Sequence, residues 1–345
     1  MLSQLQITNL RVIGHARLLP ASGINLVTGD NGSGKTSLLE AIYLLSRGRS
    51  FRHRENAPLI REGTERAQIV GHLDSGVGSR HVIGIARSKQ ELIVRVDGRP
   101  AAKRSEILRL LPVQWIGPEP QTLLTATPEY RRSFIDQGLF HVEHSYLGWL
   151  QKYQRALDQR NAELRRGGDN LAGWEVQMDE AATEIDHLRR NYLEQLVNNM
   201  ERLLATWQLD LHVESRYQRG WREGQTLGEM LKASRPVDRK QRFTGTGPHR
   251  ADLVVKSANL KSGRRLSRGQ LKMLACALHF AQSQMAAEQG LLFEILLFDD
   301  LASELDDGNR RTLWDEIAQT YKQAFITALP DKELPLAKAT PLMFH

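Results

Sequence analysis

The sequence is poor in cysteine and in aromatic residues. Its 345 residues include one cysteine, Cys276, and aromatic side chains make up 6% of the chain. A single cysteine excludes a disulfide within the chain and indicates a reducing compartment. Cys276 lies in the apolar run MLACAL, so it is interpreted as a small core residue.

Long hydrophobic runs are also absent. No stretch reaches the roughly 18 uncharged apolar residues that a membrane-spanning helix needs. The N-terminus lacks the charged start and apolar core of a secretory signal. We therefore expect a soluble, cytoplasmic protein without a membrane partner.

Positive charge is in excess. The chain has 47 Lys and Arg residues against 40 Asp and Glu residues, a net charge of +7, and its pI is about 9.6. Such an excess favours an anionic partner, either a nucleic acid or a membrane surface. A merely basic surface is the alternative that charge alone does not exclude.

One motif dominates the sequence, GDNGSGKT at residues 29–36. It matches G-x-x-x-x-G-K-[ST], a loop whose backbone N–H groups surround a polyphosphate. The β-branched run Ile24–Thr28 precedes it and the apolar helical run Ser37–Leu45 follows it. Strand, loop and helix in this order place a helix N-terminus at the phosphates. Lys35 is expected at the β and γ oxygens, and Thr36 at Mg²⁺.

Strand patterns surround the loop. Residues 2–28 alternate between apolar and polar residues and predict two or three strands, and residues 67–97 predict an antiparallel sheet with turns near residues 76–79 and 97–100. Val113–Ile116 predicts another short strand, and Pro128 predicts the start of a helix. An antiparallel sheet beside a P-loop core is unusual for a simple nucleoside kinase.

The middle of the chain is helical. Apolar residues at steps of three and four run from Leu147 to Leu164 and from Trp174 to Trp207, with a break at Gly167–Asn170. This predicts an antiparallel helical hairpin, an arm that serves partner or DNA contacts and has no catalytic residues. Strand alternation is then expected over Leu209–Glu214.

Two basic segments allow two interpretations. Arg47–Arg54 has four arginines and a histidine, and Arg235–Arg242 has four positive charges against one negative charge. The second segment is interpreted as a mobile linker. Either segment is a solvated surface or a contact to a DNA backbone.

A second half of a nucleotide site follows near the C-terminus. The apolar strand Glu294–Asp300 ends in Asp299, placed to bind Mg²⁺, and in Asp300, placed to polarise an attacking water. Leu266–Lys272 opens a strong helix, Leu271–Ala287, and so provides a second phosphate-binding helix N-terminus. One chain does not need two phosphate-binding helix N-termini for the same γ-phosphate. A symmetric dimer explains both of them, if the Leu266–Lys272 segment of each subunit covers the P-loop nucleotide of its partner.

Six motifs together carry a resemblance that extends from residue 1 to about residue 330. In chain order they are SRGRSFR at 46–52, PEYRRSFID at 128–136, GPHRADL at 247–253, LSRGQ at 266–270, LLFDD at 296–300 and SELD at 303–306. The last three are similar to the signature, the metal-binding strand and the following loop of ABC-type ATPases. The whole set resembles the RecF family, bacterial DNA-gap repair ATPases related to the SMC chromosome proteins.

The resemblance implies an α/β fold, an ABC-type P-loop ATPase head with an added antiparallel sheet and an inserted α-helical lobe. The head is expected from residues 1–137 and 237–345, and the lobe from residues 138–236. The implied cofactors are ATP and Mg²⁺. Lys35 and Asp300 are the expected catalytic residues, and Thr36 and Asp299 the expected metal ligands. The expected nucleotide contacts are Gly29, Asn31, Gly32, Ser33, Gly34, Lys35, Thr36 and Ser37, with Ser267, Arg268, Gly269 and Gln270 from the second subunit.

The resemblance also implies a biological role. It implies an ATP-dependent homodimer on single- and double-stranded DNA at gap junctions, with RecO and RecR as partners in loading RecA. DNA repair, DNA replication and the SOS response to DNA damage belong to that role.

The chain departs from the common ABC pattern at two positions. The metal-linked glutamine of many ABC ATPases corresponds here to either Gln114 or Glu119. Asp300 replaces the usual glutamate, and its shorter side chain suggests weak, slow hydrolysis. The alternative function is the ATPase subunit of a transporter, which the helical insert and the basic pI disfavour. A small-molecule kinase would leave LSRGQ and SELD without a role.

Overall fold

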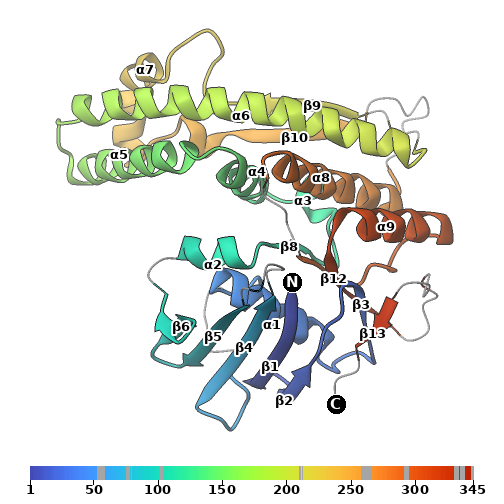
Figure 1. Ribbon diagram of the computed structural model, residues 1–345. Helices are drawn as coiled ribbons and strands as arrows, with labels where there is room; N and C mark the ends of the chain where they lie inside the picture. The colour runs from blue at the N-terminus through green and yellow to red at the C-terminus, as the bar shows by residue number, and fades with distance from the viewer. Residues whose placement is uncertain are drawn as a thin grey trace. The chain divides into compact units, whose positions relative to one another are not determined.

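The computed structural model describes residues 1–52, 59–74, 78, 80–101, 104–209, 211, 213–257, 266–290, 295–329, 334 and 339–342 (Figure 1). The chain forms two compact units. The first combines Met1–Pro120 with Leu292–His345, and the second is Gln121–Leu291. The head and lobe boundaries expected from the sequence, at residues 137 and 236, stay a prediction.

The first unit contains a six-stranded antiparallel sheet. Its strands alternate between buried and more exposed residues, as in β4, because successive side chains of a strand point to opposite faces. The strands expected within residues 2–28 and 67–97 are confirmed. In order across the sheet they are β2 (Ile13–Leu18), β1 (Leu2–Leu10), β4 (Arg66–Asp74), β5 (Arg80–Ser88), β6 (Leu92–Val96) and β7 (Arg99–Pro100).

A five-stranded parallel sheet completes the first unit. Every neighbouring pair in it is parallel, so the carboxyl ends of its strands lie at one edge. The P-loop follows β3 and the two aspartates follow β11, while β12 lies between these strands. The order across the sheet is β13 (Ala339–Pro341), β3 (Gly23–Thr28), β12 (Gln323–Ala328), β11 (Ile295–Phe298) and β8 (Val113–Ile116).

Helix α1 (Lys35–Arg47) contacts strands of both sheets. Leu38, Leu39, Ile42 and Leu45 are fully buried on it, and burial of each such side chain stabilises the fold by about 1.5–3 kcal/mol. The P-loop helix therefore belongs to the main core of this unit, which holds the loop in place. Two further helices of the unit are α2 (Arg104–Leu110) and α9 (Asp307–Thr320).

The second unit is built on a helical hairpin. Helices α5 (Tyr146–Arg166) and α6 (Ala172–Thr206) lie side by side (Figure 1). Gly167 ends α5 at φ 74°, a left-handed conformation that glycine adopts without strain. The hairpin predicted from the apolar spacing is confirmed, although Leu147 is 40% exposed rather than part of its core.

The remaining elements of the second unit surround this hairpin. A two-stranded antiparallel sheet pairs β9 with β10. The strand expected over 209–214 was wrong in its bounds, because β9 begins at Val213. These elements are α3 (Thr122–Thr125), α4 (Pro128–Val142), β9 (Val213–Gln218), α7 (Leu227–Gln241), η2 (Pro248–Arg250), β10 (Asp252–Ser257) and α8 (Arg268–Glu288). Among the described residues, no helix has both the length and the apolar character that crossing a membrane requires.

The interpretation of Arg235–Arg242 as a mobile linker is wrong. This segment is mostly helical, the second half of α7. A capping box starts the helix, in which the Thr226 hydroxyl accepts from the Glu229 N–H (3.1 Å) and the Glu229 carboxylate accepts from the Thr226 N–H (2.9 Å). The helix continues through Pro236 although proline removes one backbone hydrogen bond.

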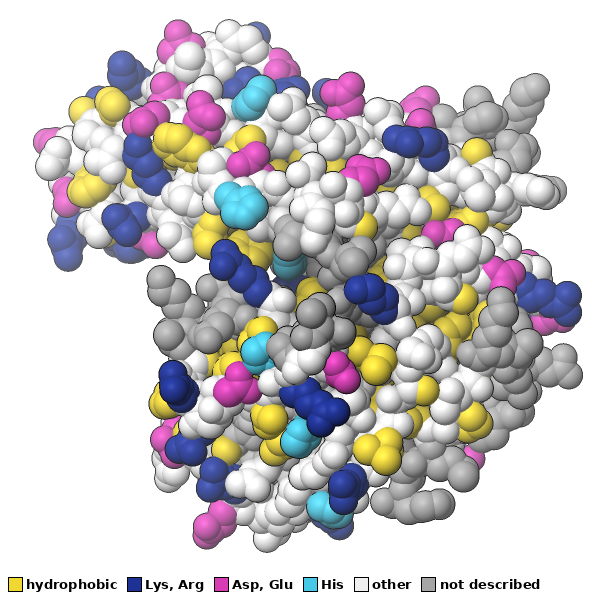
Figure 2. All heavy atoms as spheres, in the orientation of Figure 1, with side chains coloured by type: hydrophobic (Ala, Val, Ile, Leu, Met, Phe, Trp, Pro, Cys, Tyr) yellow, Lys and Arg dark blue, Asp and Glu magenta, His cyan; other side chains and the backbone are white. Residues whose placement is uncertain are grey.

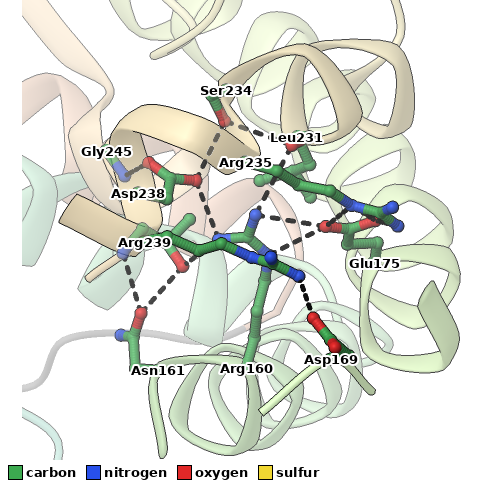
Figure 3. A network of polar contacts seen from close by, with 11 residues as sticks. Arg160, Asn161, Asp169, Glu175, Leu231, Ser234, Arg235, Asp238, Arg239 and Gly245 are labelled. Carbon is green, nitrogen blue, oxygen red and sulfur yellow. Dashed lines mark hydrogen bonds and ion pairs between the residues drawn. The ribbon is translucent and has the colours of Figure 1, made fainter. Parts of the chain in front are cut away.

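Ion pairs hold α7 to the hairpin (Figure 3). The Arg160 side chain is fully buried and donates to Glu175 of α6 (3.1 Å) and to Asp238 of α7 (2.9 Å). Arg235 of α7 donates to the same Glu175 (2.5 Å), and Arg239 pairs with Asp169. Burial alone would raise the pKa of Glu175, yet the hydrogen bonds from Arg235 and Arg160 lower it. Ion pairs with partners distant in the sequence therefore stabilise this helix, together with its capping box and the buried Leu227 and Leu231.

Candidate nucleotide site

The P-loop has the backbone that its glycines predict. Gly32 and Gly34 have φ values of 83° and 103°, in the left-handed region that residues with a Cβ rarely adopt. Helix α1 begins at Lys35 directly after Gly34. Of the expected contact residues in the loop, Asn31 and Ser33 are exposed and Ser37 is buried. The loop therefore presents a helix N-terminus to an anion.

The Lys35 ammonium lies on the loop itself. Its Nζ donates to the carbonyl oxygens of Gly29 (2.5 Å) and Asp30 (2.9 Å). Asp30 is exposed and Gly29 is partly exposed. Lys35 can therefore exchange these partners for phosphate oxygens without leaving a buried group unsatisfied.

Thr36 and Asp299 are brought together from positions 263 residues apart. The Thr36 hydroxyl lies 3.2 Å from Asp299 Oδ1. Two neighbouring ligands of an octahedral Mg²⁺, each at about 2.1 Å, are separated by about 3 Å. A hydroxyl and a carboxylate are also the hard oxygen donors that Mg²⁺ prefers. These two residues therefore fit a magnesium ion whose other ligands are phosphates and water.

Asp300 and a residue that sequence reasoning missed complete this edge of the sheet. Asp300 has φ 55°, a left-handed conformation uncommon outside glycine. Its backbone N–H donates to the hydroxyl of Thr327 (2.8 Å), which in turn donates to Asp299 Oδ1 (2.6 Å). Thr327 stands in the apolar strand β12 and is 1% exposed. A β-branched side chain is typical of a strand, so no signal in the sequence showed that Thr327 belongs to the nucleotide site rather than to the strand alone.

The structure separates the two candidates for the metal-linked residue. Gln114 pairs with Leu296 in register, two residues before the end of β8, and its amide oxygen accepts from the Tyr321 hydroxyl (2.7 Å). Glu119 follows the end of β8 and is exposed. Because β8 runs parallel to β11 and the Ile116 carbonyl accepts from the Asp299 N–H, Glu119 follows the strand end that lies beside Asp299, and Gln114 lies within the strand. Which of the two is linked to the metal stays a prediction.

The arginine cluster after α1 is only partly available for an anion. Arg47 is 9% exposed and donates to the Val113 carbonyl (3.2 Å), and burial lowers its pKa. Neither interpretation of the segment, a solvated surface or a contact to DNA, therefore holds for this residue. Arg49 and Arg52 are exposed, whereas His53 and Arg54 lie outside the described residues. The Arg52 N–H donates to the Ser50 hydroxyl, which pairs with the buried Glu40 of α1.

The signature segment belongs to the second unit and starts α8. Ser267 is the N-cap, and its hydroxyl accepts from the Gln270 N–H (3.2 Å) while the Gln270 side chain accepts from the Ser267 N–H (2.9 Å). Ser267, Arg268 and Gln270 are exposed and Gly269 is partly exposed. The Ser267 hydroxyl proton is not used in the capping bond, so it remains a donor for a phosphate.

Two motifs of the second unit fold against each other. Arg131 donates two hydrogen bonds to Asp252 (2.7 and 2.9 Å), and Arg132 donates to the Ala251 carbonyl (2.7 Å). Nearby, His249 accepts from Tyr153 at Nδ1 (2.7 Å) and donates to the Thr244 carbonyl (3.1 Å), and burial lowers the pKa of His249 to about 4. The stretches PEYRRSFID and GPHRADL are thus joined by structural contacts.

Comparisons with known proteins identify the family of the whole chain. Residues 1–344 match the family described as the RecF/RecN/SMC N terminal domain. The chain is 39% identical over 338 residues to the DNA replication and repair protein RecF of Pseudomonas putida strain F1, covering 96% of this chain and 92% of that protein. It is 36% identical to the RecF of Shewanella baltica strain OS155, covering 100% and 97%.

Solved structures show the same fold. A structure of the recombination mediator protein RecF-ATP in the RecFOR pathway superimposes with a TM-score of 0.84 at 27% identity, covering 96% of this chain and 93% of that one. An Smc head bound to the C-winged helix domain of ScpA matches with a TM-score of 0.60 at 16% identity, covering 100% and 97%. The second likeness concerns the fold alone.

Proposed function

The chain belongs to the RecF family of DNA replication and repair proteins, within the RecF/RecN/SMC group, and on this premise we propose that it is a DNA-binding ATPase whose ATP acts as a dimerisation switch. ATP and Mg²⁺ are the proposed cofactors, with hydrolysis slow and release of the dimer as its result. The observation that carries this proposal is the 3.2 Å approach of the Thr36 hydroxyl to Asp299 beside the P-loop.

In the proposed mechanism each residue has one role. Lys35 and the loop N–H groups bind the β- and γ-phosphates. Thr36 and Asp299 would hold Mg²⁺, which would supply positive charge against the phosphates. Asp300 orients the attacking water and accepts its proton. Ser267 and Gly269 of a second subunit donate to the γ-phosphate from the N-terminus of α8.

Family membership removes the basis for the alternative, a transporter ATPase subunit. The proposal further includes RecO and RecR as partners in loading RecA at single-strand gaps, since the RecF-ATP structure is described as part of the RecFOR pathway. A cytoplasmic location stays a prediction, and it agrees with DNA as the partner.

The dimer is tested at Ser267, and we expect Ser267→Asp to abolish ATP-dependent dimerisation while ATP binding is unchanged. An aspartate keeps an N-cap oxygen for α8, but its charge repels the partner's γ-phosphate, so the dimer dissociation constant should rise about tenfold or more. Asp300→Asn, in contrast, should bind ATP and accumulate as a dimer. Sedimentation with ATP and DNA measures both, and Ser22→Arg, at an exposed site of the first unit, is the control.

Two results would contradict the shared site. Equal loss of ATP binding and dimerisation in Ser267→Asp would mean that the signature acts within its own subunit. An Asp300→Asn protein that stays monomeric with ATP and DNA at all concentrations would exclude ATP as the clamp.

For DNA, the proposed contact surface includes the exposed side of α7. On the face of the molecule that Figure 2 shows, Lys and Arg side chains are spread among acidic side chains. The net positive charge therefore does not by itself locate a DNA-binding surface. The buried pair of Arg160 with Asp238 and the half-buried pair of Arg235 with Glu175 anchor α7. Its cations Lys232 and Lys240, and Arg242 at its C-cap, are exposed.

We expect the double variant Lys240→Gln, Arg242→Gln to bind duplex DNA about tenfold more weakly at about 0.1 M salt. The slope of log affinity against log salt is negative, and each lost phosphate contact should reduce its magnitude by about 0.9. Loss of both contacts should therefore reduce the magnitude of the slope by about 2. Fluorescence anisotropy across a salt series measures both quantities. The control Arg95→Gln, Arg99→Gln removes two exposed cations from the antiparallel sheet. A wild-type affinity that does not depend on salt would exclude backbone contacts, and equal losses in both variants would exclude α7 as the specific surface.

A further inference from the structure

Thr327 lies between the two halves of the first unit's nucleotide site. Strand β12 stands between β3, which leads into the P-loop, and β11, which leads into the two aspartates. Thr327 pairs with Val27 in register, one residue before the end of β12. Only 1% of it is exposed. This polar side chain is therefore placed at the edge of the sheet where the phosphate and metal residues gather.

The hydroxyl of Thr327 contacts both aspartates, and chemistry fixes its orientation. Asp299 Oδ1 lies 2.6 Å away and the Asp300 backbone nitrogen 2.8 Å away. An ionised carboxylate can only accept a hydrogen bond and an amide N–H can only donate one. The single hydroxyl proton must therefore point to Asp299, which leaves an oxygen lone pair to accept from Asp300.

These two bonds act on both aspartates, on the carboxylate of Asp299 and on the backbone of Asp300. Asp299 Oδ1 also accepts from the Thr36 hydroxyl, so Thr327 holds the oxygen that faces the metal-binding hydroxyl. The bond to the Asp300 N–H stabilises a backbone at φ 55°, which a residue with a Cβ adopts at a cost. That backbone conformation decides where the Asp300 side chain begins.

We propose that Thr327 is a positioning residue of the nucleotide site, whose hydroxyl aligns the metal-binding Asp299 with the hydrolytic Asp300. The proposal rests on the proposed ATPase function. It assigns no contact with ATP to Thr327, which acts through the two aspartates. Loss of the hydroxyl should therefore affect magnesium use and the chemical step, but leave the P-loop's own hold on the nucleotide intact.

The test compares Thr327→Val with Thr327→Ser in the full chain. Valine replaces the hydroxyl by a methyl group, which removes both the donor to Asp299 and the acceptor for the Asp300 N–H, so kcat should fall about tenfold or more and the Mg²⁺ concentration for half-maximal turnover should rise by about as much. Serine keeps the hydroxyl, and both quantities should stay within about threefold of wild type. Affinity for a fluorescent ATP analogue in EDTA should be the same in all three proteins.

A control variant separates this effect from the loss of any threonine hydroxyl. Thr320→Val removes a hydroxyl-to-carboxylate bond to Glu316 (2.9 Å) at the end of α9, before β12 begins. It should leave turnover and its Mg²⁺ dependence unchanged. Wild-type turnover is measured first, because absence of Mg²⁺-dependent turnover there contradicts the proposed function rather than the role of Thr327.

Three results would overturn the role of Thr327. The first is a Thr327→Val protein with wild-type kcat and Mg²⁺ dependence. The second is a Thr327→Ser protein that loses as much as Thr327→Val, which would assign the effect to packing of the γ-methyl group. The third is a loss of ATP-analogue binding in EDTA by Thr327→Val, which would show a change in the fold of the unit.

Discussion

Lys35→Met is expected to lower ATP affinity at least about 100-fold, or roughly 3 kcal/mol, which is the upper range for a hydrogen bond between charged groups. Lys35 carries the only positive side-chain charge in the loop GDNGSGKT, whose other charged residue, Asp30, is negative. Its ammonium is therefore the charge that the loop can direct at the β- and γ-phosphates. Methionine keeps a similar volume but provides no donor. Isothermal titration with ATP and Mg²⁺ measures the loss.

The same variant should remain folded. In the structure Lys35 donates to the Gly29 and Asp30 carbonyls, and water can replace it there because the loop is accessible. The melting temperature should therefore change little. Lys89→Met, at an exposed position of the β5–β6 turn, is the matched control and should bind ATP as wild type does. Equal ATP affinities in Lys35→Met and wild type would exclude the P-loop as the nucleotide site.

Arg160→Leu is expected to destabilise the second unit by about 3–5 kcal/mol, because it leaves buried charges without their central partner. Arg160 donates to Glu175, to Asp238 and to the Thr244 hydroxyl (2.8 Å), and its side chain is fully buried. The Thr244 hydroxyl in turn donates to Asn161 (2.8 Å). One substitution therefore disrupts contacts among α5, α6 and α7 together (Figure 3).

Hydrogen exchange provides the measurement, since it reports on α5–α7 separately from the first unit. Their amides should exchange about 100-fold faster or more in Arg160→Leu, which corresponds to 3 kcal/mol. Lys152→Ala removes an ion pair between α5 and α6, in which the side chains of Lys152 and Glu180 are 35% and 55% exposed. That control should cost under about 1 kcal/mol. Similar exchange in both variants would show that the buried network contributes no more than a surface pair.

Much of the first unit could be predicted from the sequence, because its signals are local. The alternation in residues 2–28 and 67–97 predicted strands, and the P-loop motif predicted both the backbone at Gly32 and Gly34 and the helix after it. In the second unit, the helix predicted over Leu271–Ala287 is confirmed as α8, although it already begins at Arg268, after the N-cap Ser267. In each case the residues that specify the structure are within a few positions of one another.

The errors share a different cause. Arg235–Arg242 lacks apolar periodicity and contains Pro236, yet Glu175 and Asp169, which lie 60 and 70 positions from their arginine partners, stabilise it as part of a helix. Arg47 was read as a charged loop residue, but the Val113 carbonyl and the surrounding core bury it. Charge patterns indicate solubility or an anionic partner, and they do not reveal which charges find a partner inside the fold.

The P-loop, the paired aspartates Asp299 and Asp300 and the signature at Ser267 were determined by the sequence alone, since each needs particular residue types at fixed spacing. Which of these groups meet was decided only by the tertiary structure. Parallel pairing of β3, β12 and β11 brings their carboxyl ends to one edge, so that Thr36 reaches Asp299 and the hydroxyl of Thr327 joins both aspartates. A threonine in an apolar strand has no role in the site until the neighbouring strand β11 places the Asp299 carboxylate and the Asp300 backbone N–H beside it.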